Sequence, residues 1–242
     1  MLICWSFWVR RTAWNCRWER ATSLFVFAML LTGVFTFHLT ADPVGRGLYA
    51  LTRLHNLGHF FAQVTFLGGI CAVVYSAVAK LTTDKEFAQW FKRRVELPLA
   101  VGVALDFALF AASKVSDNPH PDFNTMQTTG VFLSAYWLLY SGMLLYLLYH
   151  LTRALIDLWH DEPSRKIVNL YLVANGFLAT AALLRVITVI VQSPGGSALF
   201  YLSFMCHTIA VGILAFAAGW SWQARVRWFR PPRPLPEKEE SL

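Results

Sequence analysis

Charged residues are scarce in this chain. Lys, Arg, Asp and Glu make up 14% of its 242 residues, whereas 56% are hydrophobic and 15% are aromatic. A soluble domain usually has about a quarter of its residues charged, because its surface must be solvated by water. Because charged residues are so few, we expect no separate water-soluble domain. The composition instead predicts that most of the chain lies in a lipid bilayer.

The sequence motifs of catalysis and of metal binding are also missing. The four cysteines form no Cys-x-x-Cys pair, and the chain has no His-Glu-x-x-His, no phosphate-binding loop and no dinucleotide-binding glycine pattern. We therefore expect neither an enzyme nor a resident cofactor. The net charge of +7 comes from basic residues at the edges of apolar runs, which is typical of topology signals, so no nucleic-acid partner is expected.

Six apolar runs are long enough to cross a bilayer, which takes about 20 residues. The predicted spans are residues 21–39, 57–79, 97–113, 127–151, 167–191 and 197–220. Of the 21 Lys and Arg residues, 17 lie in alternate connecting segments that include both ends of the chain, and 3 lie in the others. Because positive residues stay on the cytoplasmic side, the prediction is an all-α bundle of six transmembrane helices in the plasma or inner membrane, with both termini in the cytoplasm.

Two cytoplasmic segments outside these spans have the pattern of amphipathic helices. Residues 1–20 carry four tryptophans and four arginines, and residues 83–96 place Phe87, Trp90 and Phe91 at helical spacing beside basic residues. Both are predicted to lie in the membrane interface and to bind anionic lipids. Residues 221–242 are expected to be a basic, Pro-rich cytoplasmic tail, and the protein to assemble with a second copy or a membrane partner.

Four polar residues within the predicted spans are candidates for a functional site, because ionisable groups at membrane depth are costly. They are Asp106, Asn175, Arg185 and His207. Counted along the helices, Asp106, Asn175 and His207 fall near mid-membrane, where an Asp–His pair can relay a proton. The alternative is a polar clasp that only holds helices together. Arg185 is predicted to reach the outer interface or to pair with an outer carboxylate.

Four histidines map to the outer rim of the predicted bundle, namely His38, His55, His59 and His120. His55 and His59 share a helix face if the second span begins before Asn56. With nearby aspartates, imidazoles are a suitable ligand set for a divalent metal, and two of them can ligate one haem. The alternative is that they are ordinary interfacial side chains.

A stretch from Ala135 to about Val191 carries a resemblance to a known group of proteins. It contains a Tyr-rich helix, a short basic loop and a helix with a central glycine, Gly176. In this it resembles the membrane half of actinobacterial multi-pass proteins classed as transporters, which accompany genes of mobile elements. The resemblance implies a polytopic helical fold and transport, but it carries no catalytic residue.

These observations predict a small transporter or channel-like protein with a buried polar site at mid-membrane. An alternative is a non-catalytic membrane protein that acts by interaction or regulation, for example in exclusion or defence of the phage or prophage type. A third interpretation is a haem- or metal-binding membrane protein that uses the rim histidines.

Overall fold

The part of the chain that the structure describes is helical apart from short turns. The computed structural model describes residues 2–9, 20–36, 38–79, 81, 84–113, 130–160, 162, 165–191 and 196–228. Its helices are α1 (Leu2–Val9), α2 (Arg20–Thr36), α3 (His38–Thr52), α4 (Leu57–Val78), α5 (Asp84–Phe91), the π-helical η3 (Lys92–Glu96), α6 (Leu97–Ala112), α7 (Val131–Trp159), α8 (Arg165–Val191) and α9 (Gly196–Trp228). The all-α fold class is confirmed for these residues.

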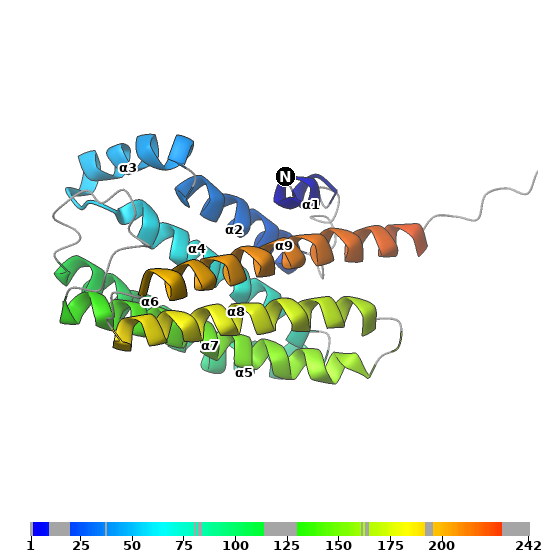
Figure 1. Ribbon diagram of the computed structural model, residues 1–242. Helices are drawn as coiled ribbons and strands as arrows, with labels where there is room; N and C mark the ends of the chain where they lie inside the picture. The colour runs from blue at the N-terminus through cyan, green and yellow to red at the C-terminus, as the bar shows by residue number, and fades with distance from the viewer. Residues whose placement is uncertain are drawn as a thin grey trace, which may run out of the picture.

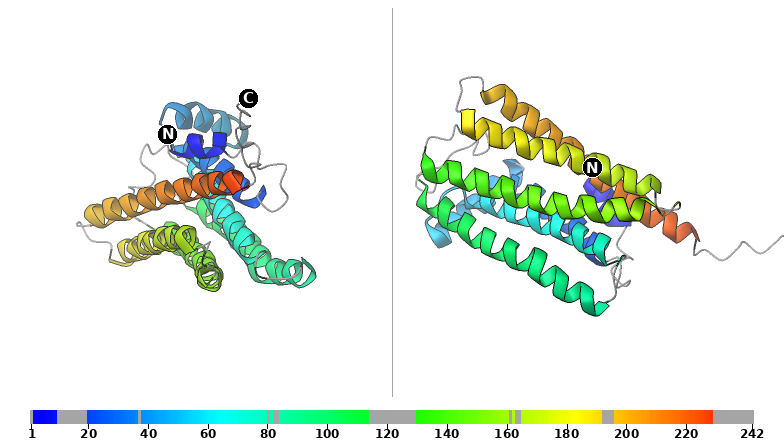
Figure 2. Two further views of the ribbon diagram at one scale, coloured as in Figure 1. Left: turned by 90° about the vertical axis from the view of Figure 1, so that its right-hand side faces the viewer. Right: turned by 90° about the horizontal axis from the view of Figure 1, so that it is seen from below.

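The long helices form a row, with a second pair laid against it (Figure 1). α6, α7 and α8 each pack against the next helix in the chain, and the view from below shows these helices and α9 side by side (Figure 2). α4 packs against α7, and α2 packs along α4. The centre of the bundle therefore lies between α4 and α7, where Phe66 and Leu147 are almost fully buried.

Five helical stretches are long and apolar enough to cross a membrane. They are Leu57–Val78, Phe87–Ala112, Val131–Trp159, Arg165–Val191 and Ala198–Gln223. These stretches fit a membrane-embedded, multi-pass protein, and each overlaps one of the predicted spans. The predicted first span corresponds to α2, which is apolar but has only 17 residues.

α2 is nevertheless a full member of the bundle, because hydroxyl groups and a glycine join it to α4. The hydroxyls of Thr22 and Ser76 lie 3.0 Å apart, as do those of Thr32 and Thr65. A Cβ on Gly69 would come within 2.6 Å of the Met29 side chain. Small and hydroxylated residues of this kind are typical of closely packed helices in membranes.

The structure differs from the predicted separate helix at residues 83–96. α5, η3 and α6 follow one another without a break, so the span reaches back to Phe87. Pro98 explains the π-helical stretch, because it has no N–H to offer to the carbonyl of Arg94. The hydroxyl of Tyr146 on α7 donates to that carbonyl instead, at 2.5 Å.

A further difference concerns residues 40–56, which were expected to be a loop. α3 occupies most of this segment and lies at one end of the bundle (Figure 1). Arg53 and Asn56 then adopt left-handed backbone conformations, with φ of 62° and 59°. These two residues turn the chain into α4, which begins at Leu57.

The N-terminal helix lies at the other end of the bundle. Of the predicted interfacial segment 1–20, the structure describes residues 2–9, which form α1 and pack against α9 and α2, and Arg20, which begins α2. The ring of Trp5 stacks on Phe216 of α9 with 6.3 Å between centroids. Of the predicted tail, residues up to Trp228 continue α9, and the rest lies outside the described residues.

Candidate functional site in the bundle core

Five buried polar side chains from four helices lie at a similar depth in the bundle. Gln63 is six residues after the start of α4, Asp106 is six before the end of α6, and Arg185 is six before the end of α8. The other two, Tyr136 and Tyr140, come five and nine residues after the start of α7. Helices that follow one another in the bundle run antiparallel, so the starts of α4 and α7 lie at the same end as the last residues of α6 and α8. The group lies about 8–14 Å inside this end at 1.5 Å per residue. We call these five residues the polar layer.

Asp106 is held in this layer by the close approach of α6 to α7. Gly102, Asp106 and Phe110 recur every four residues and are the buried positions of α6. A Cβ on Gly102 would come within 2.3 Å of the Met143 sulfur, so the glycine lets the two helices approach. Asp106 is thereby turned into the bundle, where only 1% of its surface is exposed.

Asp106 brings a hydrogen-bond acceptor into apolar surroundings. Its Oδ1 atom is buried and accepts no hydrogen bond from any residue that the structure describes. Its carboxyl lies close enough to the hydroxyl groups of Tyr136 and Tyr140 to act on both electrostatically. Burial of a carboxyl oxygen without a hydrogen-bond donor destabilises the fold. Such a group in a membrane protein is therefore a candidate for a functional role.

The two tyrosines connect the layer to the neighbouring helices. The hydroxyl of Tyr136 donates a hydrogen bond to Oε1 of Gln63, which joins α7 to α4. The Tyr136 ring contacts Phe110 of α6, with 6.0 Å between centroids. Tyr140 lies one helical turn further on the same face of α7 and is also buried.

Arg185 reaches the same layer from α8 and is covered by aromatic rings. Its guanidinium carbon lies 3.7 Å from the ring centroid of Trp137 and 5.3 Å from that of Phe200. Its side chain is 7% exposed, and its charge acts on both Tyr136 and Tyr140. Cation–π contact of this kind stabilises a guanidinium away from water. The outer carboxylates predicted as partners of Arg185 are Asp117 and Asp122, which lie outside the described residues.

Asn175 lies deeper in the bundle and forms a clasp between α8 and α7. Its side-chain nitrogen donates to the carbonyl of Leu148 at 3.1 Å and to the hydroxyl of Thr152 at 2.5 Å. These partners lie nearer the far end of α7, so Asn175 is not part of the polar layer. Both contacts are the helix-joining hydrogen bonds that the clasp interpretation predicts.

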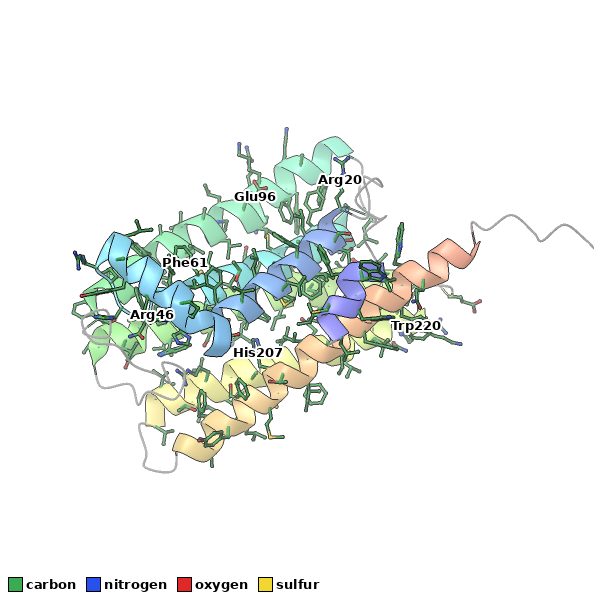
Figure 3. All side chains as sticks on the ribbon, turned by 90° about the horizontal axis from the view of Figure 1, so that it is seen from above. Arg20, Arg46, Phe61, Glu96, His207 and Trp220 are labelled. Atoms are coloured by element: carbon green, nitrogen blue, oxygen red, sulfur yellow. The ribbon has the colours of Figure 1, made fainter. Side chains whose placement is uncertain are left out.

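His207 does not meet Asp106. The His207 ring lies against Phe66 of α4, with 4.4 Å between centroids, and forms no hydrogen bond with another described residue. Figure 3 shows it on α9, about midway along the bundle. Asp106 lies on α6, across α4 and α7 from α9. It is also closer to one end of its span than expected, because that span extends back to Phe87.

The rim histidines are not brought together among the described residues. His55 precedes α4 and stacks on Tyr49, with 4.0 Å between centroids, so it shares no helix face with His59. The side chain of His38 and all of His120 lie outside the described residues. In that described part, no group of three or more His, Cys, Asp or Glu residues could hold a metal ion.

Sequence reasoning missed three members of the polar layer. Gln63 lies within an apolar run, and Tyr136 and Tyr140 belong to the Tyr-rich helix, so none of the three stands out in the sequence as an ionisable group within a span. The useful signal was the spacing of the tyrosines, since residues four apart share a helix face.

No family model matches this chain, and no curated protein or solved structure matches it either. The resemblance to actinobacterial transporter-like proteins therefore stays a prediction. The five apolar helices place the chain with multi-pass membrane proteins as a class, and its activity has to be argued from the polar layer.

Proposed function

We propose that this protein is a small transporter or channel-like protein of the plasma or inner membrane, and that Asp106 carries the translocated proton or small cation. The observation that supports this proposal most is that the Oδ1 atom of Asp106 is buried and accepts no hydrogen bond from any described residue. A carboxyl group can bind and release a proton or hold a cation. The hydroxyls of Tyr136 and Tyr140 and the amide of Gln63 add further polar groups at the same depth.

The proposed orientation has six spans, with α2 as the first and both termini in the cytoplasm. Cationic side chains gather at one end of the bundle. Among the described side chains, that end holds Arg20, Lys92, Arg93, Arg94, Arg153, Arg165 and Lys166, and the opposite end holds Arg46 and Arg53. Figure 3 labels Arg20 and Trp220 toward one end and Arg46 toward the other. An excess of Lys and Arg marks the cytoplasmic side, so the polar layer lies in the outer half of the membrane.

Proton flux into sealed vesicles tests this function. Purified protein is reconstituted into liposomes that contain a pH-sensitive dye, and a potassium gradient with valinomycin makes the interior negative. Wild-type vesicles are expected to acidify faster than empty ones. Asp106→Asn keeps the shape of the side chain but cannot release a proton, so its rate is expected to fall to that of empty vesicles.

Thr152→Val is the matched control, because it removes a polar contact of Asn175 outside the polar layer. It is expected to keep the wild-type rate. Normal acidification with Asp106→Asn would contradict the assignment, as would wild-type vesicles that behave like empty ones. A third outcome is that Asp106→Asn does not fold but Asp106→Glu does. If vesicles with Asp106→Glu then acidify no faster than empty ones, Asp106 stabilises the bundle and does not carry protons. The protein is then better described by the alternative of a membrane interaction or regulatory protein.

A further inference from the structure

A second group of polar and aromatic side chains lies at the cation-rich end of the bundle, where α5 and η3 meet α7. The ring of His150 makes edge-to-face contacts with Trp90 at 5.4 Å and with Tyr146 at 4.7 Å between centroids. Tyr149 contacts it in the same way at 5.3 Å. Nε2 of His150 is buried and forms no hydrogen bond with a described residue. A polar ring atom is therefore enclosed by aromatic rings with its hydrogen-bonding capacity unused.

Two arginines from different segments lie near this histidine. Arg153 is three residues after it on the same helix, and the carbonyl of Arg94 binds Tyr146, which is four residues before it. Arg94 of η3 and Arg153 of α7 are both exposed, and they are the two charges that act on the His150 ring. The hydrogen bond from Tyr146 to the carbonyl of Arg94 ties η3 to α7 at this point. The packing of η3 against α7 thus brings two arginines into the neighbourhood of one imidazole. Guanidinium groups bind phosphate oxygens through paired hydrogen bonds.

An apolar stripe leads away from Arg94 along α6. Leu97, Val101 and Leu105 lie at helical spacing and are 61%, 54% and 54% exposed. In a membrane such a stripe faces acyl chains. Cationic groups therefore lie at the interface, and an apolar stripe runs from them into the membrane. This arrangement is complementary to a phospholipid, in which a phosphate is joined to acyl chains.

We propose that Arg94, Arg153 and His150 form a binding site for the phosphate of an anionic glycerophospholipid, whose acyl chains lie along the exposed stripe of α6. The two guanidinium groups neutralise the phosphate, and the contact of the His150 ring with Trp90 keeps the two segments that carry them together. Trp90 and Tyr149 fit the headgroup level, where aromatic side chains are enriched. The site is separate from the polar layer and stands whether or not the protein transports protons.

Native mass spectrometry of the full-length protein in detergent tests the site. The protein is titrated with phosphatidylglycerol and, separately, with phosphatidylcholine of the same acyl chains. We expect the wild type to retain phosphatidylglycerol preferentially. The double variant Arg94→Gln/Arg153→Gln is expected to bind phosphatidylglycerol about tenfold more weakly, with unchanged binding of phosphatidylcholine.

The variant Lys92→Gln/Lys166→Gln is the matched control, since it removes the same charge from exposed positions outside the cluster. It should keep the wild-type affinity. An equal loss in both double variants would mean that diffuse surface charge attracts the lipid, and the site would be abandoned. Displacement of the lipid by millimolar inorganic phosphate would show a free-anion site instead. If Arg94→Gln/Arg153→Gln does not fold, Arg153→Gln alone replaces it. Equal binding of the two lipids to the wild type overturns the proposal without any variant.

Discussion

Hydrogen bonds between helices matter in the polar layer, because the interior of a bilayer contains no water that could replace a lost hydrogen-bond partner. The contact from Tyr136 to Gln63 is such a bond, and both side chains are buried. Measured couplings of this type in membrane proteins are modest, since the unfolded chain also finds partners within the membrane. The bond is therefore expected to orient the layer more than to stabilise the protein.

A double-mutant cycle of Gln63→Leu and Tyr136→Phe measures this bond. The expected coupling energy is about 0.6 kcal/mol and at most about 1.7 kcal/mol. Unfolding in mixed micelles, followed by circular dichroism, gives the free energy of each variant. Gln63→Leu combined with Asn175→Ala is the control cycle, because Asn175 binds Thr152 and Leu148 instead. A control coupling as large as the test coupling would mean that the effect is not specific to the Tyr136–Gln63 bond.

At the scale of secondary-structure elements, the aromatic side chain of Trp5 packs α1 against α9. Trp5 lies over Gly219, where a Cβ would come within 2.4 Å of the indole ring. The same ring stacks on Phe216. Gly219 is thus required for close approach, and α1 is a packed part of the fold rather than a helix that only touches lipid.

Gly219→Val is expected to displace α1 from α9. Overpacking of a tight contact costs about 1–3 kcal/mol, so the amide protons of residues 2–9 should exchange roughly 5- to 150-fold faster. Hydrogen-exchange mass spectrometry of the N-terminal peptide measures this. Gly212→Val makes the same substitution in the same helix, where a Cβ would meet nothing within 4 Å. If both variants accelerate exchange in α1 equally, the Trp5–Gly219 contact does not hold this helix.

At the scale of the whole molecule, hydrophobic length predicted most of the helices. A bilayer imposes one length on every span, and this constraint is visible in composition alone. α3 was not predicted, because Pro43 and the glycines that follow it are typical of loops. The continuity of α5 with α6 was missed because the basic residues of η3 also suggested a connecting segment.

The candidate site was predicted only in part, for a geometrical reason. Counting residues gives the depth of a side chain along its helix, and Asp106 and Arg185 lie within two of the five apolar helices. It does not give the rotation of a helix about its axis or the order of helices in the bundle. Those two quantities place His207 against Phe66 rather than beside Asp106.

The number of spans decides where the two ends of the protein lie, and α2 is the helix on which it depends. At 1.5 Å per residue its 17 residues cover about 26 Å, slightly less than the hydrocarbon thickness of about 30 Å. Its hydroxyl contacts with Ser76 and Thr65 keep it alongside α4. A helix packed along a spanning partner is expected to cross the membrane with it. Six spans put both termini on the same side, whereas five put them on opposite sides.

Reporter fusions distinguish these two arrangements directly. A fluorescent protein that folds only in the cytoplasm is joined to the N-terminus, to the C-terminus, or after residue 162 between α7 and α8. Alkaline phosphatase, active only outside, is joined after residue 54 between α3 and α4. All four fusions are expected to be active, because the cation-rich end of the bundle faces the cytoplasm. A dark N-terminal fusion beside a fluorescent C-terminal one would show that α2 does not cross, and an inactive phosphatase fusion would reverse the proposed orientation.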